Sequence, residues 1–283
     1  MTDRLKNKVA VITGSGGGVG RAVALLMASE GASIVVNDLG RDTDGEYLAD
    51  KVVQEISKGG GRAVANLDSV ATMAGGTSII NTAIENFGRL DILVNNAGNF
   101  VKASTVDLTE AQWDAVIAVH MKGHFACSQP AIKEMMKQKH GRIINVSSMA
   151  AARGIGVAYC SVKAGILGFT TSLATELKDV GITVNAVLPS AVTNLFPDKI
   201  ASMPGLPPQK RLGPEYAAPI FAYLATDEAK DVTGRFFKMG NGDFIIYPVP
   251  LSVPGGPATP VFKDDVWTVE ELIKIVPPLL SNG

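Results

Sequence analysis

Tyr159 and Lys163, four residues apart in the stretch AYCSVKAG, are the first candidates for chemistry in this chain of 283 residues. Residues i and i+4 of a helix lie on one face, so the phenol and the ammonium would be neighbours. A phenol with its usual pKa of about 10 is a poor base at neutral pH, and an adjacent positive charge favours its phenolate form. The pair therefore predicts an acid–base site, although the same spacing also occurs in ordinary helices.

A glycine cluster near the N-terminus, in VITGSGGGVGRAVA, is a second candidate site. Gly14, Gly18 and Gly20 permit a tight turn and let backbone N–H groups approach a pyrophosphate. The helix expected after them adds a partial positive charge at its N-terminus. We therefore expect a dinucleotide site that also includes Ser15 and Val19, the alternative being a glycine-rich turn that binds nothing.

Asp38, at the end of the second expected strand, bears on the choice of cofactor. A carboxylate there accepts hydrogen bonds from the adenosine ribose and repels a 2′-phosphate, which predicts NAD rather than NADP. Two alternatives stay open: Arg41 would neutralise such a phosphate, and Asp38 would be only a loop cap. Further contacts with the adenosine and the riboses are expected from Asp68, Ser69, Asn95, Ala97 and Gly98.

Short apolar runs alternate with helical patterns along most of the chain, which predicts a parallel sheet with helices on both faces. A helix is expected over residues 109–139, with Thr109 as its N-cap and a bend at Pro130. A second long helix carries the Tyr159 pair. Strands are expected at residues 8–13, 33–38, 62–68, 91–96, 141–148, 182–189 and 234–242.

Composition argues against several classes of protein. The net charge of −1, from 26 basic and 27 acidic residues, does not favour nucleic acid or an anionic membrane as a partner. Cys127 and Cys160 do not make a disulfide framework, and with three scattered histidines we expect no metal site. The N-terminal residues do not resemble a signal peptide, and we expect no apolar run that spans a bilayer. A soluble, cytoplasmic protein is the expectation.

TGxxxGxG, NNAG, a serine and YxxxK follow one another at separations that resemble those of the short-chain dehydrogenase/reductase family. This resemblance covers about residues 5–242 and implies one doubly wound, Rossmann-type α/β domain. It implies that Tyr159 is the general acid/base and that Lys163 holds the nicotinamide ribose and lowers the pKa of the tyrosine. Of the two adjacent serines, the resemblance selects Ser148 over Ser147 to bind the substrate oxygen. It also implies cofactor contacts from Pro189, Val192 and Thr193.

His120, in AVHMKGH, takes the position where the family often has an asparagine that supports a water relay to the lysine. Two readings stay open. The histidine either packs within its helix, or it keeps the relay through its imidazole or its main-chain carbonyl.

A narrower resemblance, in VVNDLGRD, VHMKG and PEYAAP, is to the (3R)-hydroxyacyl-CoA dehydrogenase unit of the peroxisomal multifunctional β-oxidation enzyme, which uses NAD. It implies that a 3-hydroxyacyl-CoA is oxidised to the 3-ketoacyl-CoA. The alternatives are a cyclic or aromatic hydroxyacyl-CoA, a hydroxysteroid or another cyclic alcohol, or a catalytically silent partner subunit.

Two further expectations concern the surroundings of the domain. Residues 190–213 are expected to form a lid that selects the substrate, in which Lys199, Lys210 and Arg211 either meet CoA phosphates or stay solvated. The domain is expected to span residues 1–242, and a C-terminal extension, 243–283, to pack on it or on a neighbouring subunit. The two long helices resemble those that pair between subunits in the family, which implies a homodimer or homotetramer.

Overall fold

The computed structural model describes residues 3–193, 213–240 and 243–247. Most of the predicted lid, with its three basic residues, and the extension beyond residue 247 lie outside this part. The chain divides into two compact units, Met1–Ile246 and Tyr247–Gly283. The first unit contains the sheet and helices described below.

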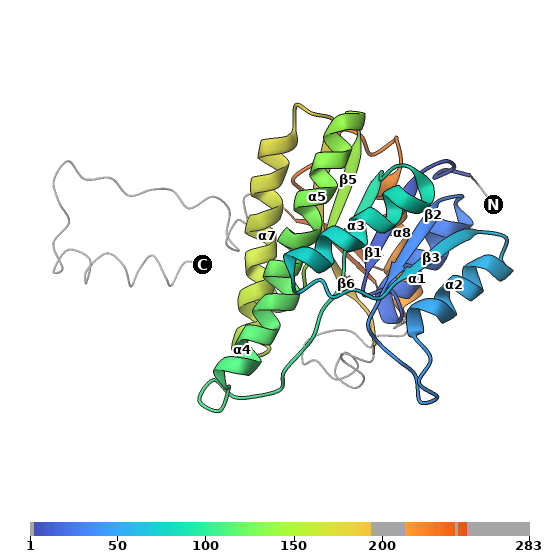
Figure 1. The fold of residues 1–283 in the computed structure, drawn as a ribbon. Coiled ribbons are helices and arrows are strands. Elements are labelled where there is room, and N and C mark those ends of the chain that lie inside the picture. The colour runs from blue at the N-terminus through green and yellow to red at the C-terminus, as the bar shows by residue number, and fades with distance from the viewer. Residues whose placement is uncertain (1–2, 194–212, 241–242, 248–283) are drawn as a thin grey trace, which may run out of the picture. The chain divides into compact units, whose positions relative to one another are not determined.

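The described strands form one sheet in the order β3-β2-β1-β4-β5-β6-β7-β8, and every pair from β3 to β7 is parallel (Figure 1). This confirms the predicted parallel-dominated α/β fold. The strands are β1 (Val9–Thr13), β2 (Ser33–Asn37), β3 (Arg62–Asn66), β4 (Ile92–Asn95), β5 (Gly141–Val146), β6 (Ile182–Ser190), β7 (Phe236–Gly240) and β8 (Asp243–Tyr247).

Helices cover both faces of the sheet. Successive residues of a strand point to opposite sides, so each buried strand contributes side chains to two cores. Ala10 and Ile12 join the core under α1, α2 and α8, whereas Val9 and Val11 join the core under α3, α5 and α7 (Figure 1). The helices are α1 (Gly18–Ser29), α2 (Leu48–Lys58), α3 (Met73–Phe87), α4 (Glu110–Ile117), α5 (Gly123–Gln138), α6 (Ala150–Arg153), α7 (Val157–Leu177) and α8 (Ala218–Ala225).

The strand order reverses at β1, which lies between β2 and β4. In open parallel sheets, ligands bind beyond the carboxyl ends of the strands at this switch point. Thr13, Asn95, Val146 and Ser190 are the last residues of β1, β4, β5 and β6. The segments that carry the candidate residues therefore leave the sheet at one edge.

The long helix expected over residues 109–139 is interrupted. Thr109 caps α4 through a reciprocal pair of hydrogen bonds with Gln112, as its position predicted. Pro130 lies inside α5, with helix on both sides of it. The interruption is instead a π-helical turn at Ala118–Lys122, which contains His120.

The 21-residue helix α7 is the one helix in the described ranges that is long and apolar enough to cross a membrane, which the sequence reading had not expected. It packs against α4, α6, β5 and β6. Its residues Ile166 and Thr170 are fully buried, and its Lys163 is also buried. We therefore assign α7 to the core of the domain.

Asp91, just before β4, is the buried anchor of the opposite edge of the sheet. Its carboxylate accepts hydrogen bonds from Nε and Nη2 of Arg89, at 2.8 and 2.6 Å, and from the backbone N–H of Val9 at 2.9 Å. Asp91→Ala is expected to lower the free energy of unfolding by about 3 kcal/mol, because it leaves the buried Val9 donor unpaired. Urea denaturation measures the loss. Asp3→Asn, which removes the charge of an exposed pair with Lys6 and tolerates the positive φ of residue 3, is the control and should cost less than about 1 kcal/mol.

Candidate active site

The glycine turn and the NNAG segment form one unit. Gly14 has a φ of +63°, and a Cβ there would lie 2.7 Å from the Cα of Ala97. The Asn96 amide donates to the carbonyls of Thr13 and Gly14, at 2.8 and 2.9 Å. The Thr13 hydroxyl accepts from the N–H groups of Asn96 and Ala97, both at 3.0 Å. Asn96 and Thr13 were not among the predicted site residues, although both belong to the motifs that the sequence reading used.

Three observations at the N-terminus of α1 test whether a pyrophosphate fits there. No side chain caps the helix at Gly17, and its first turn has no acidic residue. A Cβ at Gly17 would meet nothing within 4 Å, so the backbone is open on that side. A Cβ at Gly18 would lie 3.2 Å from Cγ2 of Thr193, which brings the segment after β6 against the turn. Uncapped helix N–H groups beside an open turn suit an anionic phosphate.

Asp38 lies against the same turn. Its carboxylate accepts hydrogen bonds from the N–H of Gly16 at 2.8 Å and of Gly40 at 2.7 Å. The Arg41 guanidinium stacks over the ring of Tyr47, 3.5 Å from the centroid, and donates to the Gly45 carbonyl at 2.6 Å. The glycine turn thus faces the negative charge of Asp38, while the positive charge of Arg41 is held by contacts within the Arg41–Tyr47 loop.

Several other predicted cofactor residues use their side chains within the protein. The Ser15 hydroxyl donates to the Ile12 carbonyl at 2.7 Å, and Val19 belongs to the core. The Asn95 amide donates to Asn145 at 2.9 Å and to Ser128 at 3.0 Å. Ser15 is fully buried, and its backbone N–H also donates within the protein, to the Asn37 carbonyl at 2.9 Å. Pro189 and Val192 are half-buried at and just after the end of β6, and Gly98 lies against His120.

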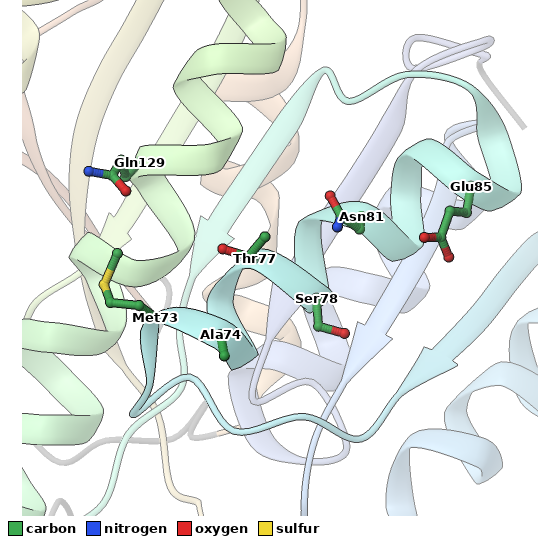
Figure 2. A pocket seen from close by; sticks show the side chains of 7 residues that line it. All are labelled: Met73, Ala74, Thr77, Ser78, Asn81, Glu85 and Gln129. Carbon is green, nitrogen blue, oxygen red and sulfur yellow. The ribbon is translucent and has the colours of Figure 1, made fainter.

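Asp68 and Ser69 lie between β3 and α3. The Asp68 carboxylate accepts from the Ser78 hydroxyl at 2.7 Å, and the Ser69 hydroxyl accepts from the N–H of Ala71 at 3.2 Å. Ser78 also lines a surface groove along α3, shown in Figure 2, which none of the predicted site residues lines. The groove is lined by Met73, Ala74, Thr77, Ser78, Asn81, Glu85 and Gln129.

Ser148 and Tyr159 lie side by side, and Ser147 turns away. A hydrogen bond between the side chains of Ser148 and Tyr159 lowers the pKa of Tyr159. Ser147 is buried, and its hydroxyl donates to the Lys163 carbonyl at 2.6 Å. Of the two serines that the sequence offered, Ser148 is the one beside the tyrosine.

The electrostatics of the pair differ from the expectation that Lys163 lowers the pKa of the tyrosine. Burial raises the pKa of Tyr159 to about 12 and outweighs the Ser148 hydrogen bond. Burial lowers the pKa of the Lys163 ammonium to about 7. Lys163 Nζ donates to the Val146 carbonyl at 2.7 Å and lies 5.5 Å from the centroid of the Tyr159 ring. Burial therefore shifts both groups toward their neutral forms, because their charged forms are poorly solvated.

His120 packs directly on the tyrosine. The two rings meet edge to face, with centroids 5.5 Å apart. His120 Nε2 lies 2.9 Å from the Asn99 carbonyl oxygen and 3.1 Å from the Asn99 nitrogen. Burial, and then the charge of Lys163, lower the pKa of His120 to about 2, so the ring is neutral. Phe100 meets another side of the Tyr159 ring, with centroids also 5.5 Å apart.

Known proteins resemble this chain over most of its length. The model of the short chain dehydrogenase family matches residues 8–202. The peroxisomal hydratase-dehydrogenase-epimerase of Saccharomyces cerevisiae is 42% identical over 247 residues, which are 84% of this chain but only 26% of that protein. The Thauera aromatica (2S)-[(R)-hydroxy(phenyl)methyl]succinyl-CoA dehydrogenase subunit BbsD is 37% identical over 84% of this chain and 97% of its own. The crystal structure of a short chain dehydrogenase from Mycobacterium avium superposes with a TM-score of 0.85 at 38% identity, covering 99% of this chain and 96% of that one.

Proposed function

The chain belongs to the short-chain dehydrogenase family and is an oxidoreductase, and from this premise we propose that it oxidises a 3-hydroxyacyl-CoA to the 3-ketoacyl-CoA with NAD. The observation that carries the chemistry is the Tyr159 phenol, held beside the Ser148 hydroxyl and above the buried Lys163. A titratable group beside a hydroxyl donor, in a water-poor site, is suited to moving the proton of an alcohol.

In the proposed reaction the substrate carbon loses a hydride and its oxygen loses a proton. Bound NAD supplies the hydride acceptor at its nicotinamide ring. Ser148 holds the substrate oxygen, and the Tyr159 phenolate takes the hydroxyl proton as the C=O bond forms. Lys163, when protonated, stabilises the phenolate and binds the nicotinamide ribose. In the reverse direction, Tyr159 returns the proton to the alcohol.

The preference for NAD over NADP is proposed from Asp38. Its carboxylate lies against the glycine turn, where it would repel a 2′-phosphate, and Arg41 is held over Tyr47. Asp38→Ser is expected to shift the ratio of kcat/KM for NAD over NADP by at least about tenfold toward NADP, which is ~1.4 kcal/mol. Asp44→Ser, in the same loop, is the control and should leave the ratio unchanged. An unchanged ratio in Asp38→Ser would remove the basis for this preference.

The substrate class is proposed from the narrow sequence resemblance and from the names of the relatives. Both curated relatives described above carry a dehydrogenase name, and that of the Thauera aromatica protein specifies a CoA thioester with an aromatic ring. An aromatic hydroxyacyl-CoA is therefore the second candidate. Initial rates with straight-chain and phenyl-substituted 3-hydroxyacyl-CoA, at equal concentration, separate the two.

We also propose that the protein is a homodimer or homotetramer and that it is active alone. The Thauera aromatica relative is named as a subunit of a dehydrogenase. The alternative is therefore that this chain is a silent subunit that needs a second protein for turnover. Light scattering gives the mass of the particle, and turnover by the purified chain excludes the silent partner. A monomer would contradict the proposed oligomer. A chain that binds NAD but turns over only with a second protein would contradict the proposal that it is active alone.

A further inference from the structure

His124, one helical turn after His120, is a buried titratable residue that the proposed reaction does not use. Its Nδ1 lies 2.6 Å from the His120 carbonyl oxygen. A carbonyl only accepts hydrogen bonds, so Nδ1 of His124 must carry the proton and Nε2 must be bare. Burial lowers the pKa of His124 to about 3, which keeps this neutral form at working pH.

The hydrogen bond closes on the π-helical turn that interrupts the helix. At the end of the turn, Ala118–Lys122, the His120 carbonyl accepts from two donors, the backbone N–H of Gly123 and the side chain of His124. Nε2 of His124 is buried and has no hydrogen-bond partner among the described residues. Among the described residues, the hydrogen bond from Nδ1 is therefore the one polar contact of the His124 ring. Edge-to-face packing on Phe169, with centroids 6.3 Å apart, holds the ring in place.

The backbone of His120 also determines where the His120 ring lies. Its ring is wedged between the Asn99 backbone and the Tyr159 ring. A Cβ at Gly98 would lie 2.7 Å from Cε1 of His120, so the ring has no room to move on that side. A rotation of the π turn would therefore displace the surface against which the tyrosine packs.

We propose that His124 is a positioning residue, whose Nδ1–H holds the His120 carbonyl and thereby sets the His120 ring against Tyr159. This role rests on the proposed function, because its consequence is the placement of the phenol that exchanges the proton. With this role for His124, the π turn is part of the active site and not an irregularity of helix packing.

Two substitutions separate hydrogen bonding from packing. In His124→Asn the amide nitrogen takes the place of Nδ1, so the donor is kept while volume is lost. His124→Leu keeps more of the volume and has no donor. We expect kcat to fall by at least about tenfold in His124→Leu, with the KM for NAD unchanged, and to return within about threefold of the wild type in His124→Asn. Thermal unfolding should rank them in the opposite order, since the smaller side chain leaves a cavity.

A packing role would make kcat follow stability, with His124→Leu the better enzyme, and that result would overturn the proposal. A readout without substrate comes from the ¹⁵N chemical shifts of labelled histidine rings. We expect His124 protonated at Nδ1 and bare at Nε2, and His120 shifts that move in His124→Leu and return in His124→Asn. A proton on Nε2 of His124 would refute the assignment. Because these spectra need no turnover, they decide the role of His124 even if the proposed substrate is wrong.

Discussion

Replacing Tyr159 by phenylalanine is expected to lower kcat by about 10²–10⁴-fold, the usual contribution of one acid–base group. The substitution removes one oxygen and keeps the ring that packs between His120 and Phe100. The fold and the glycine turn should therefore be unchanged. Steady-state rates with saturating NAD measure the loss, and quenching of protein fluorescence measures NAD affinity, which we expect within about threefold of the wild type.

The matched control is Tyr223→Phe, in α8, which removes a hydroxyl from a ring that is 43% exposed. Its kcat should equal that of the wild type. Activity retained in Tyr159→Phe would show that another group exchanges the proton. Loss of NAD affinity together with activity would show that Tyr159 is a binding residue and not the acid–base group.

Replacing Lys163 by methionine should lower kcat/KM by about 10²-fold or more, since no positive charge would then stabilise the phenolate. The same substitution should not lower the free energy of unfolding at neutral pH. It removes the donor to the Val146 carbonyl, which costs about 1 kcal/mol, but it also removes a buried charge. An enzyme that is inactive yet at least as stable as the wild type is the expected result. Rate measurements and urea denaturation together test it.

The pH dependence of that stability has a definite sign. Burial lowers the pKa of Lys163 from 10.5 to about 7, so between these values the unfolded chain binds more protons than the folded protein. The contribution of this lysine to the free energy of unfolding therefore rises with pH over that window. Relative to the wild type, Lys163→Met should be most stable below pH 7 and lose this advantage as the pH rises. Lys178→Met, at the exposed end of the same helix, should show no such trend.

The framework of the site was predictable from the sequence because its signals are local. Glycines that need a positive φ, a cap at Thr109 and short apolar runs such as VAVI act within a few residues. Their order along the chain then fixes which strand ends share an edge of the sheet. The edge strand β8 was not predicted, because DFIIY runs directly into a Pro-rich stretch.

The parts that the sequence did not reveal depend on contacts between distant segments. The residues around Arg41 in the sequence do not predict that its guanidinium stacks on Tyr47. The raised pKa of Tyr159 follows from burial, which spacing does not measure. The π turn at His120 was also missed, since Pro130 was the one residue of 109–139 at which the sequence predicted a bend.

The most direct test of the account is to mix the purified protein with NAD and a medium-length (3R)-hydroxyacyl-CoA, with the (3S) isomer in parallel, and to follow the formation of NADH. We predict rapid reduction that is selective for the R isomer and that is lost in Tyr159→Phe. No reduction with either isomer, by protein that still binds NAD, would contradict the proposed substrate. R-selective reduction that persists in Tyr159→Phe would contradict the proposed chemistry.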